Sequence, residues 1–219
     1  MKKFISIMLV MLMTFGIVAF SGCTSDKEEI KEEESQTEID FGTSNPVAVI
    51  TVKKLGKITV ELYYEKAPNT VKNFISLANK GFYDGLTFHR VISGFMVQGG
   101  CPEGTGTGNP GYGIVGEFAA NGIENDIVHT RGVISMARGS YSYDSAGSQF
   151  FIMHEDASHL DGQYAAFGMV IDGMDVVDQI AASETDYNDK PLKDVVIESV
   201  VVYTQGKTYG EPATVERLF

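Results

Sequence analysis

Short β-rich runs punctuated by glycine dominate the chain from Pro46 to Tyr203, and they restrict its fold more than any other feature. Only residues 67–81, which open on Ala-Pro-Asn-Thr and close on Lys-Gly, and residues 174–181 have helical spacing. Many short strands with two helices, and no regular strand–helix alternation, favour a mainly β barrel or sandwich. The expected strands are residues 47–52, 57–63, 87–92, 95–98, 132–137, 149–153, 165–170 and 195–203.

The first 22 residues have the pattern of a secretory signal: Lys2 and Lys3, an apolar run, and small residues before Cys23. This arrangement resembles a bacterial lipoprotein signal peptide, in which the cysteine is lipidated and becomes the mature N-terminus. Phe20 stands where that signal usually carries leucine or another aliphatic residue. Because the apolar run is near the lower length limit of a spanning helix, an uncleaved transmembrane anchor is one alternative, and ordinary secretion is another.

Residues 23–45 are interpreted as a lipidated cysteine followed by an acidic, flexible linker. Glu, Asp, Ser, Thr and Lys dominate this stretch, so it cannot bury enough apolar surface to offset the entropy cost of ordering. The predicted organisation is a signal peptide (1–22), this linker (23–45), a globular domain (46–205) and a C-terminal tail (206–219). Such a protein would lie on the extracytoplasmic face of the cell membrane, held by its lipid anchor.

Charge and cysteine content exclude two classes of protein. The formal net charge is −12, whereas phosphate binding requires clustered Lys and Arg, so no nucleic acid is expected as a partner. The chain has 2 cysteines, Cys23 and Cys101, which excludes a disulfide framework. Cys101 follows two glycines and has no activating partner nearby in the sequence, so we interpret it as a buried or idle thiol.

One arginine stands out when the strands are examined for alternation. In residues 87–92, strand alternation places Phe88, Arg90 and Ile92 on the same face. A guanidinium among apolar side chains is costly unless it is paired or binds a ligand. From this stretch alone, a structural ion pair and a ligand-binding role are equally good interpretations of Arg90.

Two further strands repeat the combination of an apolar and a hydrogen-bonding side chain on one face. Gln149 shares a face with Phe151, and Met96 shares a face with Gln98. Three strands that each present such a pair would suit a shallow pocket for an amphipathic ligand.

Other motifs do not support a cofactor or metal site. Residues 106–111 match the dinucleotide pattern G-x-G-x-x-G, but a proline and a following Tyr-Gly indicate a wide loop instead of a helix start. The spacing of His154-Glu155-Asp156 and His159 matches no standard zinc pattern and favours a polar turn. His89 and His129 are isolated, and we interpret both as hydrogen-bonded structural residues. Neither a cofactor nor a metal is therefore expected.

Six blocks of sequence, in order and with matching spacing, resemble the cyclophilin family over about residues 47–203. The blocks are Phe88–Ile92, Gly94–Gly100, Gly116–Phe118, His129–Ala137, Gly147–Ile152 and Leu160–Gly162. The resemblance implies a closed eight-stranded antiparallel barrel capped by two α-helices, with the active groove on the outside of the barrel. It also implies peptidyl-prolyl cis-trans isomerase activity.

Roles for individual residues follow from the same resemblance. Arg90 would be the catalytic residue, and Phe95, Met96, Phe151 and Leu160 would form the proline pocket. Gln98 and Gln149 would bind peptide backbone, while the backbone of Ala137 and Arg138 would hold the residue that precedes proline.

Three positions depart from the family pattern. His159 stands in place of a groove tryptophan, Tyr164 in place of a pocket-edge histidine, and Arg138 in place of a common asparagine. The tryptophan is linked to cyclosporin binding, so the departure at His159 bears on drug sensitivity more than on catalysis.

The function expected from these residues is isomerisation of X–Pro bonds during extracytoplasmic protein folding. The expected partners are proline-containing segments of unfolded or exported proteins, and the protein is expected to act as a monomer. The alternatives are a binding module that holds proline-containing segments without turnover and a holdase that binds through exposed apolar surface.

Overall fold

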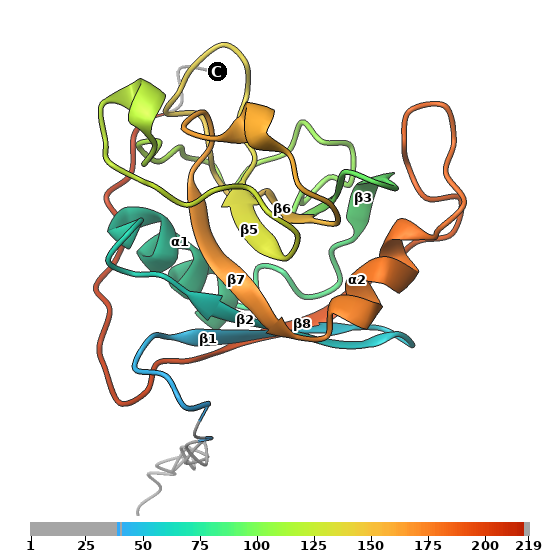
Figure 1. Cartoon of the computed structure of the whole chain (residues 1–219), viewed down its shortest axis with the longest axis horizontal. Helices are drawn as coiled ribbons and strands as arrows, with labels where there is room; N and C mark the ends of the chain where they lie inside the picture. Colours follow the sequence, from blue (N-terminus) through green and yellow to red (C-terminus); the bar gives the residue numbers. More distant parts are fainter. Residues whose placement is uncertain (1–38, 40, 217–219) are drawn as a thin grey trace, which may run out of the picture. The chain divides into compact units, whose positions relative to one another are not determined.

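Eight antiparallel strands form a single curled sheet in the order β3-β4-β6-β5-β7-β2-β1-β8 (Figure 1). The structure is a computed structural model that describes residue 39 and residues 41–216. The strands are β1 (Val47–Val52), β2 (Gly56–Leu62), β3 (Phe88–Ile92), β4 (Met96–Gly99), β5 (Val133–Met136), β6 (Phe150–Met153), β7 (Ala166–Asp172) and β8 (Ile197–Tyr203). Each overlaps one of the predicted runs, so the prediction of a mainly β fold is confirmed.

The sheet is an open half-barrel, and the prediction of a closed barrel is therefore wrong. Among the described residues, its edge strands, β3 and β8, are linked next to their ends, by an isolated bridge between Thr87 and Val196. Farther along β3, the Val91 amide donates to the Asp189 carbonyl at 2.8 Å. Asp189 belongs to the α2–β8 loop (residues 182–196), drawn in orange beyond α2 in Figure 1. Because this loop bonds to the open edge of β3, β8 cannot pair with β3 along its length and complete the barrel.

Two α-helices cover parts of the sheet, as predicted. Helix α1 (Pro68–Asn79) contacts β8, and α2 (Met174–Ala181) contacts β2, β3 and β4. Proline at the start of α1 fits the first turn because its missing N–H would have no helical partner there. Two 3₁₀ helices, η1 (Ala119–Asn121) and η2 (Ser158–Leu160), were not predicted, since three residues are too few to show a helical period.

The first turn of α1 is held by a buried carboxylate from a distant loop. Glu117 accepts hydrogen bonds from the Asn69 amide at 3.0 Å and the Thr70 amide at 2.7 Å. It also accepts one from the Thr70 hydroxyl at 2.6 Å. Ala67, at the N-cap, offers no side-chain bond of its own. The carboxylate therefore satisfies backbone donors that the local sequence leaves open.

Apolar side chains pack in two clusters, one on each face of the curled sheet. The inner core lies between the sheet and the helices, and its largest buried side chains include Phe74, Tyr83, Phe88, Phe150 and Phe167. The outer cluster consists of Met96, Val133, Phe151, Met153, Ala157, Leu160 and Ala166. Strand β6 contributes side chains to both clusters. Phe150 and Ile152 enter the inner core, while Phe151 and Met153 enter the outer cluster.

Residues that precede and follow the sheet in the sequence also contact the domain. In the predicted C-terminal tail, Tyr209 packs against Tyr64 with ring centroids 4.9 Å apart, and Val215 pairs with Gly113. At the other end, Phe41 lies 5.3 Å from the ring of Tyr203. The described residues of the tail and of the linker's end thus lie against the domain.

The predicted signal peptide, Cys23 and linker residues 23–38 and 40 lie outside the described residues. Within residue 39 and residues 41–216, no helix is both long and apolar enough to cross a membrane.

Candidate active site

A bulge in β3 determines which of its side chains face outward. Phe88 pairs with Gly99 and Arg90 with Gln98, so two steps along β3 match one step along β4. Phe88 therefore enters the inner core, whereas Arg90 lines a groove on the outer face. The prediction that Phe88 and Arg90 share a face is wrong, because a bulge at His89 breaks the alternation on which it rested.

Arg90 combines an ion pair with free donor capacity. Its Nε lies 3.3 Å from the Asp189 carboxylate, and both side chains are about two-fifths exposed, at 42% and 41%. An ion pair this exposed contributes little to stability. No hydrogen bond to another described residue involves the two terminal amino groups of Arg90. The arginine is thus fixed at one end and able to donate from the other.

The groove beside Arg90 has a volume of about 680 Å³ and joins apolar to polar walls. We call it the outer groove. Its apolar wall contains Phe95, Met96, Phe151 and Leu160. Its polar wall contains Arg90, Gln98, Arg138, Asp186, Asn188, Lys190 and residues 104–107. His89, Ala137 and Tyr164 complete the groove, so nine of the predicted site residues line one cavity.

A second hollow of about 560 Å³ adjoins the outer groove and shares Gln98, Ala137 and Arg138 with it. We call it the side pocket. Gln149 lines it and accepts a hydrogen bond from the Gln98 side chain at 3.0 Å. The Gln149 amide also donates to the carbonyls of Gly106 at 2.9 Å and Gly108 at 2.8 Å. Gln149 therefore ties β6 to the loop that forms the rim of both cavities.

His159 is the one predicted site residue that lines neither cavity in the described structure. It is exposed and stacks on Phe95, with ring centroids 5.6 Å apart. Tyr164 packs edge-on against Phe151 at 5.8 Å. His159 thus supports the apolar wall from outside, whereas Tyr164 forms part of it.

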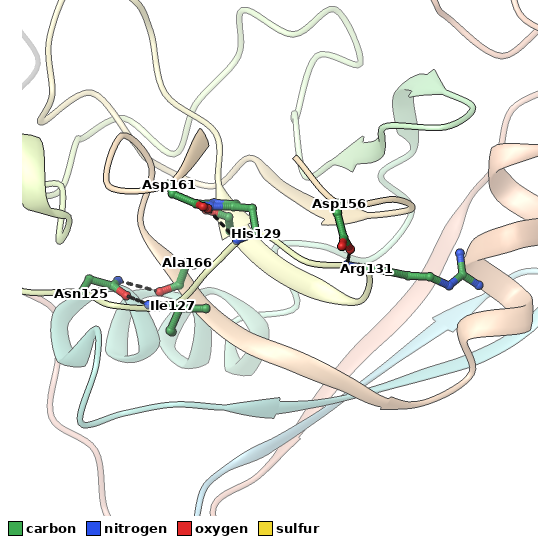
Figure 2. Close-up of polar contacts among 8 residues, drawn as sticks. Asn125, Ile127, His129, Arg131, Asp156, Asp161 and Ala166 are labelled. Atoms are coloured by element: carbon green, nitrogen blue, oxygen red, sulfur yellow. Dashed lines mark hydrogen bonds and ion pairs between the residues drawn. The ribbon is translucent and has the colours of Figure 1, made fainter. Parts of the chain in front are cut away.

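Buried hydrogen bonds lie behind the apolar wall, and some of them are drawn in Figure 2. His129 stacks on Phe151 with centroids 6.0 Å apart. One ring nitrogen of His129 lies 3.0 Å from Asp161 and the other 3.1 Å from the Ser135 hydroxyl. Figure 2 shows His129 facing Asp161, and Asn125 reaching the carbonyl of Ala166 at 2.8 Å. These bonds fix the ring behind the groove, and the interpretation of His129 as a hydrogen-bonded structural residue is confirmed.

His89 differs from His129 in its bonding. It is 6% exposed, and neither ring nitrogen has a hydrogen-bond partner among the described residues. The interpretation of His89 as a buried structural residue holds, but its contacts with the Thr87 backbone and the Gln149 side chain fall short of ordinary hydrogen-bond geometry. Its position at the β3 bulge, under the loop that carries Gly106, explains why the ring is closed off from water.

The two buried histidines should make the fold less stable in mild acid. Burial lowers the pKa of both His89 and His129 below the ordinary value of 6.5, and for His129 it outweighs the opposing effect of Asp161. As the pH falls below 6.5, the unfolded chain binds protons that the folded chain does not, so the free energy of unfolding decreases. Their contribution is complete above pH 6.5 and is lost as the pH falls through the lowered folded-state pKa values.

Urea unfolding at pH 7.5 and pH 5.0 measures this effect. We expect His89→Gln and His129→Gln to show a smaller difference in stability between the two pH values than the wild type. His159→Gln, at an exposed position, is the matched control and should keep nearly all of the wild-type difference, because the charge of His159 adds less than burial does to the lowering of the His129 pKa. An unchanged difference in both buried variants would contradict the assignment.

The other motifs lie in loops and turns, and residues 106–109 of the glycine-rich motif line the two cavities. The Gly94 amide donates to His154 at 2.9 Å, and the Arg131 amide donates to Asp156 at 2.8 Å, which confirms the polar-turn interpretation. Residues 106–111 lie in the loop between β4 and η1 and begin no helix. Cys101 is buried, and its sulfur accepts a hydrogen bond from the Gly106 amide at 3.3 Å.

Sequence reasoning missed the contribution of the α2–β8 loop. Asp186, Asn188 and Lys190 line the outer groove, and Asp189 pairs with Arg90. Asp189 has a φ of +64°, and the Asp186 carboxylate accepts bonds from the amides of Asn188 and Lys190. The Asp-Tyr-Asn-Asp run signals a turn, but nothing in it signals that the turn lies beside β3.

The arrangement is suited to binding and polarising a ligand without forming a bond to it. The outer groove places an apolar wall opposite the guanidinium of Arg90 and the amide side chains of Gln98 and Asn188. Such a site can hold a compact apolar ring and donate hydrogen bonds to the polar groups next to it.

Comparison with known proteins agrees with this geometry. Residues 47–202 match the family described as "Cyclophilin type peptidyl-prolyl cis-trans isomerase/CLD". A peptidyl-prolyl cis-trans isomerase of Helicobacter pylori is 45% identical over 175 residues, covering 79% of this chain and 92% of the relative. Peptidyl-prolyl cis-trans isomerase B of Bacillus subtilis is 56% identical over 119 residues, covering 54% of this chain and 79% of the relative.

Solved structures show the same fold. A cyclophilin-type isomerase of Cryptosporidium parvum, crystallised in the presence of the dipeptide Ala-Pro, superposes with a TM-score of 0.66 at 32% identity. The match covers 71% of this chain and 98% of that structure. The chain is thus a peptidyl-prolyl cis-trans isomerase and belongs to the cyclophilin family.

Proposed function

We propose that the outer groove catalyses X–Pro rotation and that Arg90 stabilises the twisted amide. The observation that carries this proposal is the position of Arg90, whose unengaged terminal amino groups lie in the same groove as Met96 and Phe151. Rotation about the amide must cross an intrinsic barrier of about 18–20 kcal/mol. No bond is made or broken, so the site needs selective stabilisation of the twisted state and no nucleophile.

Arg90 would act through a hydrogen bond that only the twisted amide can accept. As rotation breaks the amide resonance, the proline nitrogen becomes pyramidal and gains a lone pair. A guanidinium N–H can donate to this lone pair, whereas the planar nitrogen of the ground state cannot accept. A charged donor in a partly dry groove contributes on the order of 2–4 kcal/mol to such a state.

The remaining groove residues would hold the substrate while it rotates. Phe95, Met96, Phe151 and Leu160 would grip the proline ring, and the amides of Gln98 and Gln149 would bind peptide backbone. The proline ring is held while the adjoining segment is free to turn. The groove can therefore bind both the cis and the trans isomer of the substrate. The backbone of Ala137 and Arg138 would hold the residue before proline.

A protease-coupled assay with a short proline peptide and the full-length protein tests this proposal. With an isomerase, the rate constant of the slow cis-to-trans phase rises in proportion to protein concentration. A binding module would hold the peptide without changing that phase. A holdase would suppress aggregation of an unfolded client equally well after Arg90→Ala, because it depends on apolar surface alone.

We also propose that the protein works as a monomer at the extracytoplasmic face of the cell membrane, anchored through Cys23. Its partners there would be proline-containing segments of exported proteins. The support is the signal-like pattern of residues 1–22 and the acidic linker that follows it.

Mass spectrometry of the mature protein tests the anchor directly. We expect an N-terminus at Cys23 that carries diacylglycerol, and a Cys23→Ser variant that is recovered without acyl chains. More than one acyl chain is needed for stable anchoring, so variant protein that is still cleaved before residue 23 should leave the membrane fraction. An intact residue 1 in the wild-type protein would instead support the transmembrane alternative.

A further inference from the structure

Arg138 is fixed at the boundary between the outer groove and the side pocket. Its guanidinium lies 4.8 Å from the ring centre of Tyr164, 4.9 Å from that of Tyr143 and 5.4 Å from that of Phe118. Its Nε donates to the Gln163 carbonyl and its Nη1 to the Gly139 carbonyl, both at 3.1 Å. Three rings and two carbonyls thus hold the cation in one place.

The positive charge of Arg138 is not neutralised by a carboxylate. None of the ion pairs among residue 39 and residues 41–216 involves it. Its Nη2 makes no hydrogen bond to a described residue. In a chain with a net charge of −12, an arginine held by rings and carbonyls alone keeps an unused capacity to bind an anion.

This capacity is available to a ligand in the side pocket, which Arg138 lines. Of the residues that line the pocket in the described structure, Arg138 is the charged one. The others are Ala137, glycines, and polar or aromatic side chains, among them Asn109, Tyr141 and Gln149. A substrate side chain that enters this hollow would therefore meet a single fixed cation and several hydrogen-bonding groups.

We propose that the side pocket is an anion-selective subsite, in which Arg138 binds an acidic side chain of the substrate two residues before proline. This inference rests on the proposed function, which places the proline in the outer groove and the preceding residue over Ala137 and Arg138. Both of these residues line both cavities. The next residue upstream is then the one that can reach the side pocket.

Peptides that differ only at that position test the proposal with the full-length protein. With Glu, Gln or Lys two residues before proline, we expect kcat/KM to be about 5- to 10-fold higher for Glu than for Gln, and lowest for Lys. The preference should shrink in 1 M salt, because half-exposed charges are screened. Arg138→Gln should reduce the Glu-to-Gln ratio to about one, whatever its effect on overall activity.

Two further variants make the ratio interpretable. Arg138→Lys keeps the charge but loses the planar group that the rings hold, so the preference should be reduced but not abolished. Lys190→Gln removes a positive charge from the far side of the outer groove and should keep the wild-type ratio. Loss of the ratio in Lys190→Gln would show a general charge effect and overturn the assignment to Arg138.

Titration calorimetry of the same peptides separates this inference from the proposed function. Tighter binding of the Glu peptide that depends on Arg138, without turnover of any peptide, would support the subsite and contradict isomerisation in the groove. Turnover of all peptides at equal rates would support isomerisation and overturn the subsite.

Discussion

The substitution Arg90→Ala should lower kcat/KM for an X–Pro peptide by about 100- to 1,000-fold, equivalent to about 2.7–4 kcal/mol of transition-state stabilisation. The loss should appear in kcat more than in KM, because the proposed hydrogen bond forms only with the twisted amide. The free energy of unfolding should change by less than about 1 kcal/mol, since the ion pair with Asp189 is exposed on both sides. A protease-coupled assay and a urea titration measure the two quantities.

Arg90→Lys provides the matched control for charge. Lysine keeps the positive charge but not the fork that bonds Asp189 with one nitrogen while donating with the others, so most of the activity should still be lost. An Arg90→Ala protein with near-wild-type kcat would show that the groove works without this donor. An unfolded variant would show instead that the arginine is part of the scaffold.

The substitution Phe74→Ala should lower the free energy of unfolding by about 3–5 kcal/mol, the largest effect we expect on stability. Phe74 is fully buried in α1, and its ring centre lies 5.1 Å from that of Tyr83, 5.7 Å from Phe150 and 5.4 Å from Phe167. Removing it leaves a cavity where the helix meets the inner face of the sheet. Urea unfolding followed by circular dichroism measures the loss.

Two controls define the scale of this effect. Phe74→Leu keeps most of the volume and should cost less than the alanine variant. Tyr187→Ala removes an aromatic ring that is 94% exposed and should change stability by no more than about 0.5 kcal/mol. A loss below about 1 kcal/mol in Phe74→Ala would mean that the helix does not close the inner core as the structure indicates.

The strands and helices were predictable because their signals are local. Alternation in β6 correctly separated Phe150 and Ile152 from Phe151, since a strand without a bulge keeps a period of two. The start of α1 was visible in Pro68, and its extent in the spacing of apolar residues. The positions that line the outer groove came from the family resemblance, because alternation showed only that polar and apolar groups share a face.

The features that could not be predicted depend on contacts between distant segments. The bulge at His89 is defined by how β3 pairs with β4, and no residue type in β3 announces it. The barrel is open because the α2–β8 loop bonds to Val91 from almost 100 positions away. Likewise, Glu117 holds the first turn of α1 through a contact that the helix sequence does not encode.

In the proposed mechanism, Arg90 accelerates rotation of a bound X–Pro amide. Exchange spectroscopy on an isotopically labelled proline peptide, with the full-length protein present at saturating concentration, measures the cis–trans rate in the complex itself. We expect exchange at many times per second with the wild type, and a rate lower by about 100-fold or more with Arg90→Ala at equal occupancy. Equal exchange rates in the two complexes would contradict a catalytic role for Arg90.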